Sequence, residues 1–446
     1  SPPSPPSAEA GAPPVPPPAI LPDPRLTFAG IGRYPRDNPR GDRPVSRRRE
    51  GQAKRRRVFY IPGYDPSPPR RYREIYRREG PRQAAISGYD FAMSTGAQGP
   101  NGWAARTRDA DGPSEAVLTV LVWSDIVKAS MPRSPFASYW LLLRTAWIYI
   151  GSGTLRRLSW LRKGPLIAAF YPVAMLLFQL AFAGLAGLGV GSVAGQVQPW
   201  LGWFFGLPTV VYVLRWWKRR DGRLLAHYLM HGYAFTARVR GGWPPALEER
   251  LAAFAAEVAR ALEEDVDEVL IVGHSLGAAL GVSVAADLIR GGRVPETGPA
   301  FSLLTLGQVI PMVSFLPGAT RLRADLRLLA ASKWLTWVDV SAPGDGAAFA
   351  LCDPVAVSGV APREGRWPLV LSAAFTRTLA PETWKRLRWK FYRLHFQYLH
   401  AFDRPTDYDY FQITAGPLTL AERFEGRAPS RSRIDVPASR YTTIAA

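Results

Sequence analysis

The sequence predicts an α/β fold in which helices flank a mostly parallel sheet. Short apolar, β-favouring runs recur along the chain at 58–61, 117–123, 269–272, 302–306, 335–340 and, more weakly, 368–371. Helical stretches at 68–80, 246–264 and 276–290 separate several of these runs. The run 117–123 is almost continuously apolar, as expected of a parallel strand covered on both faces. Alternation of this kind is typical of α/β proteins.

The composition excludes a wholly disordered protein but predicts a disordered N-terminal tail. Of the 446 residues, 47% are apolar and 21% are charged, which leaves enough apolar surface for a core. Residues 1–50 are rich in Pro, Gly, Ser and Arg and hold few large apolar side chains to offset the entropy lost on ordering. We therefore expect a Pro/Arg-rich tail over residues 1–50.

The chain is strongly basic. Fifty-six Lys and Arg against 36 Asp and Glu give a net charge of +20, which favours anionic partners such as acidic lipid surfaces or nucleic acid. A basic cluster at the end of the tail is either a solvated linker or a patch attracted to anionic headgroups. It comprises Arg47, Arg48, Arg49, Lys54, Arg55, Arg56 and Arg57. Because no aromatic-rich reading motif accompanies the arginines, we do not expect nucleic acid as a partner.

Cysteine usage and the N-terminus fit a protein on a cytoplasmic face. Cys352 is the single cysteine, so it forms no intramolecular disulfide, and it lies in no metal-ligand spacing. The chain opens with Ser-Pro-Pro rather than with the charged start and short apolar core of a cleaved secretion signal. We expect no metal and no organic cofactor.

A stretch of 51 residues, 164–214, contains no Asp, Glu, Lys, Arg or His. About 20 apolar residues cross a bilayer core, so the stretch suits two crossings, which we place near 166–189 and 198–217. Basic residues at both outer ends predict that the folded parts on either side of the stretch, and both termini, lie on the cytoplasmic side. These residues are Arg156, Arg157, Arg162, Lys163, Arg215, Lys218, Arg219, Arg220 and Arg223. The alternative is a very apolar hairpin buried in a soluble protein.

The segment Gly273-His-Ser-Leu-Gly277 fits the pattern G-x-S-x-G. An apolar strand runs directly into it and a helical stretch follows at once, an arrangement that lifts a serine oxygen clear of a sheet. Gly273 and Gly277 remove side chains where such a turn brings strand and helix close together.

At these residues the chain resembles the α/β-hydrolase superfamily, and the motif sequence Gly-His-Ser-Leu-Gly is similar to that of its lipase and esterase branch. The resemblance covers roughly residues 57–125 and 245–415. It implies an α/β-hydrolase-like sheet with Ser275 as the nucleophile. The alternative is that Ser275 only caps a helix.

A serine nucleophile needs a base to remove its proton and an acid to orient that base. Of the five histidines, His274 belongs to the motif, and His227 and His231 lack the nearby acid and third ligand of a metal site. The superfamily's order of serine, acid and histidine leaves His395 and His400. We favour His395, although its spacing from aromatic neighbours also fits a plain amphipathic helix.

The expected acid lies in a turn-rich loop past the strand 335–340. The resemblance favours Asp345 there, with Asp353 as the competitor and Asp339, inside the strand, as a structural residue. Any of these carboxylates is also able to cap a turn.

The resemblance also implies two backbone donors for a developing oxyanion. Leu276, after the nucleophile, supplies the first. The loop after the first strand, where Pro62 replaces the superfamily's histidine, supplies the second from Tyr64 or Gly63. A backbone amide does this work, so Pro62 does not abolish the site.

These features predict a membrane-anchored serine hydrolase that cleaves carboxylic esters, with acyl lipids as the substrate class that the anchor favours. A basic, aromatic stretch at 384–393 is either suited to a headgroup layer or a solvated helix face. The alternative function is a catalytically silent hydrolase fold that acts as a membrane scaffold or partner-binding module. Acyl transfer to an alcohol stays open, and the sequence names no protein partner.

The expected organisation has five parts: the tail at 1–50, a first hydrolase part at 51–160, a transmembrane helical hairpin at 161–220, a second hydrolase part at 221–425 and a flexible C-terminal tail at 426–446.

Overall fold

The computed structural model describes residues 54–95, 99–132 and 134–445. All described residues lie in one compact unit. The tail expected over 1–50, with Arg47, Arg48 and Arg49, lies outside the described residues.

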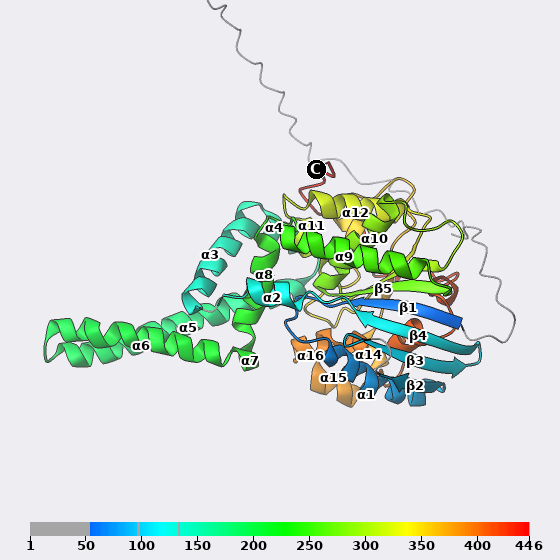
Figure 1. Cartoon of the computed structure of the whole chain (residues 1–446). Coiled ribbons are helices and arrows are strands. Elements are labelled where there is room, and N and C mark those ends of the chain that lie inside the picture. The colour runs from blue at the N-terminus through cyan, green and yellow to red at the C-terminus, as the bar shows by residue number, and fades with distance from the viewer. Residues whose placement is uncertain (1–53, 96–98, 133, 446) are drawn as a thin grey trace, which may run out of the picture. The chain divides into compact units, whose positions relative to one another are not determined.

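Within the described residues, eight strands form one mixed sheet in the order β2-β3-β4-β1-β5-β6-β7-β8 (Figure 1). From β4 to β8 neighbouring strands run parallel, whereas β2, β3 and β4 pair antiparallel at one edge. The strands are β1 (Lys54–Ile61), β2 (Asp90–Ser94), β3 (Gly102–Asp109), β4 (Gly112–Val120), β5 (Glu268–His274), β6 (Ala300–Leu306), β7 (Thr336–Ser341) and β8 (Leu369–Ser372). The α/β fold predicted from the sequence is confirmed.

Helices cover both faces of this sheet. The helices before β5 are α1 (Arg70–Ser87), α2 (Ser124–Ser130), α3 (Pro135–Gly151), α4 (Thr154–Leu158), α5 (Lys163–Gly195), α6 (Pro199–Arg219), α7 (Asp221–Leu224), α8 (Ala226–Ala237) and α9 (Pro245–Leu262). Those after it are α10 (Leu276–Arg290), α11 (Ile310–Ser314), α12 (Thr320–Ala331), α13 (Pro354–Val357), α14 (Phe375–Thr378), α15 (Pro381–Leu387), α16 (Phe391–His395), α17 (Tyr410–Ala415) and α18 (Leu420–Arg423), with a 3₁₀ turn at Gln397–Leu399.

The central strands are apolar on both faces, so each face builds its own core. In β1, Phe59 and Ile61 join the cluster under α9, α10 and α12, whereas Val58 and Tyr60 join the cluster with α1 and α17. Side chains alternate between the faces of a strand, so a continuous apolar run buries both. Figure 1 shows α9, α10 and α12 on one side of the sheet and α1 on the other.

The prediction that the basic cluster forms the end of a tail is partly wrong. Lys54, Arg55, Arg56 and Arg57 begin strand β1, and acidic side chains of the folded unit pair with each of them. The Arg56 guanidinium is buried and forms an ion pair with the buried Glu268 carboxylate. These four cations are therefore part of the fold and do not form a linker.

The C-terminal segment also differs from the flexible tail expected at 426–446. Ile434 bridges Cys352, Ala438 N donates to Val357 O at 3.0 Å, and Thr443 O accepts from Arg323 Nε at 2.8 Å. Backbone groups of this segment are paired with the folded unit, which composition alone did not reveal.

Helices α5 and α6 form a hairpin that projects from the rest of this unit (Figure 1). Gly187 and Gly191 on α5 face Gly202 and Gly206 on α6. A Cβ atom on Gly191 would lie 2.8 Å from the carbonyl oxygen of Gly202, and one on Gly206 would lie 2.9 Å from that of Gly187. Pairs of small residues four apart let two helices approach closely, as in membrane proteins.

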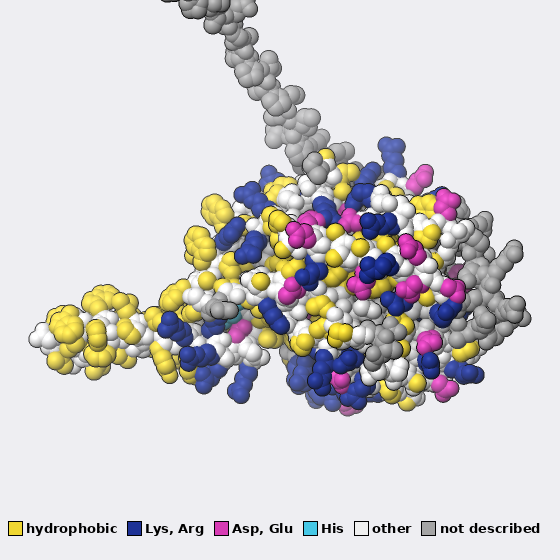
Figure 2. Space-filling model, in the orientation of Figure 1, with side chains coloured by type: hydrophobic (Ala, Val, Ile, Leu, Met, Phe, Trp, Pro, Cys, Tyr) yellow, Lys and Arg dark blue, Asp and Glu magenta, His cyan; other side chains and the backbone are white. Residues whose placement is uncertain are grey.

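The expected pair of membrane crossings is only partly supported. Among the described residues, α5 is the one helix that is long and apolar enough to cross a membrane, judged by length and composition. α6 ends in basic residues and does not meet the same measure. Leu176 packs against α3 and α8, so the projecting part of α5 begins near Leu177 and not at the expected residue 166. Figure 2 shows hydrophobic side chains over the projecting part and Lys and Arg near its base.

We predict that Gly191→Leu destabilises the hairpin and that Gly189→Leu does not. A Cβ on Gly191 meets the backbone of α6, whereas one on Gly189 meets no atom within 4 Å. Overpacking of this kind costs about 1–3 kcal/mol. Thermal unfolding in detergent, followed by Trp fluorescence, compares the two variants, and equal melting temperatures would contradict this packing.

The buried carboxyl of Asp339 predicts a pH dependence of stability. Its Oδ1 accepts from Thr305 Oγ1 at 2.6 Å, and burial raises the pKa of Asp339 to about 8. The folded chain therefore keeps a proton that the unfolded chain loses near the ordinary carboxyl pKa of 3.8, so stability falls as the pH rises between these two pKa values. Above the folded pKa the fall levels off.

Asp339→Asn should flatten this slope, because an amide keeps the acceptor for Thr305 and does not ionise. Urea unfolding at about pH 5 and about pH 8 measures the effect. The exposed Asp111→Asn is the control and should leave the slope unchanged. An unaltered slope in Asp339→Asn would mean that other groups cause the pH dependence.

Candidate functional site

Ser275 lies at a sharp turn between β5 and α10. Its backbone has φ 58° and ψ −121°, a conformation that L residues rarely adopt. Two residues before and two residues after Ser275, only glycine fits. A Cβ on Gly273 would lie 2.5 Å from Gly277 O, and one on Gly277 would lie 2.2 Å from Ile61 O. The Ser275 amide donates to Leu306 O at 2.9 Å and so ties the turn to β6.

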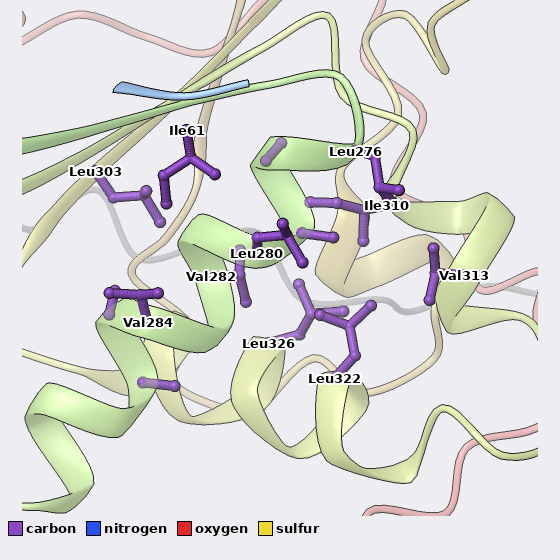
Figure 3. Packing of buried hydrophobic residues seen from close by; sticks show 14 of the residues in the cluster. Ile61, Leu276, Leu280, Val282, Val284, Leu303, Ile310, Val313, Leu322 and Leu326 are labelled. Carbon is purple, nitrogen blue, oxygen red and sulfur yellow. The ribbon is translucent and has the colours of Figure 1, made fainter. Parts of the chain in front are cut away.

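The helix that follows the turn is held firmly on the sheet. Leu276 and Leu280 of α10 belong to one buried cluster with Ile61 of β1 and with Leu322 and Leu326 of α12 (Figure 3). The packing fixes α10 and thereby the serine at its N-terminus.

The loop after β1 runs directly beside Ser275. A Cβ on Gly63 would lie 2.9 Å from Ser275 Cβ and 3.3 Å from its Oγ. Trp123 Nε1 donates to Pro62 O at 2.9 Å, and the hydroxyl of Tyr228 on α8 donates to Tyr64 O. These bonds fix the backbone of the loop next to the serine.

The two predicted oxyanion donors lie in segments that border Ser275. Leu276 is the first residue of α10, so its N–H has no carbonyl one turn earlier to bond. Tyr64 directly follows Gly63, and its side chain is buried with its hydroxyl 2.7 Å from Ser130 Oγ. Backbone amides in such positions are able to stabilise negative charge on a bound carbonyl oxygen.

His395 and Asp345, which the sequence analysis favoured, form a buried pair. His395 Nδ1 lies 2.7 Å from Asp345 Oδ2, and both side chains are buried. The rings of His395 and His274 are 4.8 Å apart, which puts His395 beside the serine turn. Gly307, with φ 51°, leaves the space for this pair, since a Cβ there would lie 3.3 Å from His395 Cε1. Among the described hydrogen bonds there is none between Ser275 Oγ and His395 Nε2.

Two further side chains hold this pair, and the sequence analysis did not assign these roles. The Tyr398 hydroxyl donates to Asp345 Oδ2 at 3.0 Å and accepts from Ala342 N at 3.0 Å. His274 Nε2 lies 2.9 Å from the carbonyl oxygen of His395, and burial lowers the pKa of His274 to about 3, so its neutral ring donates to that carbonyl. Three or four residues separate His395 from its aromatic neighbours, but that spacing signalled only an amphipathic helix.

His400 and Asp353, the alternative base and acid, make contacts outside the His395–Asp345 pair. His400 Nδ1 bonds Phe396 O at 2.8 Å, and burial lowers the pKa of His400. Asp353 caps α13 by accepting from Val355 N and Ala356 N, and burial raises the pKa of Asp353 to about 6. Neither side chain is hydrogen-bonded to His395 or Asp345.

His227 and His231 lie on α8 with their rings 6.3 Å apart. His231 Nε2 is 3.1 Å from Ser138 Oγ, whereas neither ring nitrogen of His227 has a hydrogen-bond partner among the described residues. Over the part of the chain that the structure describes, no group of three or more His, Cys, Asp or Glu is placed to hold a metal ion.

Comparison with known proteins gives one match. The family model described as Lipase (class 3) matches residues 220–314, a segment with α8, α9, β5, Ser275 and α10. No curated protein and no solved structure matches the chain. This segment is thus similar to class 3 lipases, and the match supports a lipase-type serine ester hydrolase of the α/β-hydrolase type.

Proposed function

We propose that this protein is a membrane-anchored serine hydrolase that cleaves carboxylic esters of acyl lipids through Ser275, His395 and Asp345. The observation that carries the proposal is the strained turn at Ser275 with a buried imidazole–carboxylate pair beside it. A strained backbone at a polar residue and a buried charge partner are features of catalytic sites.

The proposed reaction has two acyl transfers. Ser275 Oγ attacks the ester carbonyl carbon while His395 Nε2 takes the hydroxyl proton, and the Asp345 carboxylate stabilises the imidazolium through Nδ1–H. The amides of Leu276 and Tyr64 donate to the oxyanion. The alcohol leaves with the proton from His395, and water, deprotonated by the same ring, then releases the acyl group as a carboxylic acid and restores Ser275.

The anchor in this proposal is the α5–α6 hairpin as two crossings. The connection between the helices spans only residues 196–198, and glycines hold α6 along α5, so a bilayer that takes up α5 also takes up α6. Basic residues lie before the apolar part of α5 and at the end of α6. They favour a cytoplasmic location for the hydrolase parts, 51–160 and 221–425, and for both termini.

The basic, aromatic stretch 384–393 adds a second contact with lipid in this proposal. Trp389 and Phe391 are exposed, and Arg388 lies over the ring of Trp389 at 5.5 Å. Phe391 also packs against Gly346, next to Asp345. Exposed aromatic and basic side chains of this kind suit a headgroup layer.

A catalytically silent scaffold is the competing function, and the missing hydrogen bond between Ser275 and His395 favours it. In enzymes without substrate such bonds are often long and tighten on binding, so geometry alone does not exclude catalysis. Covalent labelling separates the two functions.

We predict that a fluorophosphonate probe labels the native protein and Ser283→Ala but not Ser275→Ala. Ser283, also on α10, is buried and its hydroxyl donates to Asp325 Oδ2 at 2.9 Å, so it has no access to the probe. Gel fluorescence reads the labelling, and melting temperatures check that both variants fold. Equal labelling of the two variants would refute Ser275 as the nucleophile, and no labelling of the native chain would favour the scaffold.

Tyr398→Phe should lower kcat about five- to tenfold with KM unchanged, since one hydrogen bond to the triad carboxylate is worth about 1 kcal/mol. The matched control is Tyr408→Phe, which also removes a buried hydroxyl, but one that donates to Tyr398 O at 2.8 Å and does not touch Asp345. Steady-state kinetics on a soluble ester measure both. An equal fall in the two variants would show a general packing effect.

A further inference from the structure

Helix α3 exposes a row of large apolar side chains and turns Ser138, Thr145 and Tyr149 inward together with Leu142. Exposed side chains recur every three or four residues along it, with Trp147 79% and Trp140 67% exposed. The whole outward row is Phe136, Trp140, Leu143, Trp147 and Ile150. A helix on a soluble protein has the reverse arrangement, with its apolar stripe toward the core.

The inward face of α3 is fixed to the protein by hydroxyl groups. Ser138 Oγ lies 3.1 Å from His231 Nε2, and Tyr149 OH is 3.0 Å from Thr236 Oγ1 and donates to Met312 O at 2.9 Å. These bonds prevent the helix from turning its aromatic side chains inward. The apolar row is therefore a permanent surface of this unit.

Helix α3 meets the hairpin where the projecting part begins. The Tyr139 hydroxyl donates to Leu176 O at 3.1 Å, and Lys218 Nζ donates to Pro132 O at 2.7 Å and Ser134 O at 2.9 Å. From Leu177 to the end of α5 at Gly195 the helix is about 29 Å long at 1.5 Å per residue, which matches a bilayer core of about 30 Å. In Figure 1 α3 runs across the direction of the hairpin at this level.

The segment that contains this apolar row carries charge of one sign. Residues 126–220 contain no Asp or Glu and eleven Lys or Arg. The exposed Trp160, just after α4, lies under Arg157, whose guanidinium carbon is 4.4 Å from its ring centroid. Figure 2 shows hydrophobic side chains on the outward side of α3 with Lys and Arg nearby. Apolar side chains bordered by basic ones fit the surface of an anionic bilayer.

We propose that the outward row of α3, with Trp160, lies in the plane of the bilayer surface, at the boundary between anionic headgroups and acyl chains. The inference rests on the proposed anchor, because the depth of α3 is set by where the hairpin enters the bilayer. α3 packs on α8, whose Tyr228 bonds the loop carbonyl of Tyr64 beside Ser275. When α3 lies in the bilayer surface, it thus holds the serine site at a fixed distance from the leaflet that contains the ester substrate.

Single cysteines measure the depth of each surface in the full-length chain. The native Cys352 is buried, so an introduced exposed thiol takes the label. We would place an environment-sensitive fluorophore at Trp147→Cys on α3, at Leu188→Cys on the hairpin and, as the control, at Ala92→Cys on the exposed side of β2. The protein is reconstituted in nanodiscs of phosphatidylcholine and phosphatidylglycerol that carry doxyl-labelled lipids, and iodide serves as the aqueous quencher.

We expect shallow doxyl groups to quench the label at Trp147 at least about fivefold more than at Ala92, with iodide quenching reversed. Quenching at Trp147 equal to that at Ala92 would overturn the proposal. Protection of Trp147 from both quenchers would also overturn it, and would indicate a second copy of the chain on α3. Lipid quenching at Leu188 without quenching at Trp147 leaves the anchor intact, whereas its loss at both positions removes the anchor as well.

If Trp147→Cys fails to fold, Ile150→Cys reports on the same row, since Ile150 is exposed on the same side of α3.

Discussion

The close approach of three backbone segments at Ser275 is the constraint on which the site depends. β5 ends, α10 begins and the loop after β1 passes over the turn, with glycine at each point where a side chain would collide. Because Ser275 has a positive φ, the turn stores strain that the surrounding packing must hold. Leu276 and Leu280 are buried in the core under β1, so the core of the sheet and the serine turn are one packed structure.

The apolar hairpin packs against residues that neighbour the serine site. Gly164, in the first turn of α5, packs on Gly346, because a Cβ there would lie 3.0 Å from the Gly346 Cα. Asp345, which holds His395, is the preceding residue. On the other side of the site, α8 lies against α5 and its Tyr228 reaches Tyr64. The hairpin is thus built into the same packing that orients the acid and the loop after β1.

Local pattern was enough to predict much of the fold and the serine turn. Each of the six predicted strands is mostly apolar and overlaps an observed strand, and glycines at 273 and 277 marked the turn. β2 and β3 were not predicted, because neither has a continuous apolar run, and β3 carries the exposed Arg106 and Arg108. The partners of Arg56 and the contacts of Ile434 come from residues far along the chain, so no local pattern reveals them. For the same reason the sequence left two histidines and two acids open, whereas the hydrogen bond between His395 and Asp345 is a tertiary contact.

The position of the hairpin in the chain has a consequence for biosynthesis. β1 lies between β4 and β5 in the sheet, but β5 follows the hairpin by about 50 residues in sequence, so the register Val58–Leu270 closes a loop of 212 residues. Such a long-range pairing forms late. A ribosome therefore releases both apolar helices while β1 still lacks β5, its second neighbour. The nascent chain must keep these helices from aggregating before β5 to β8 complete the sheet.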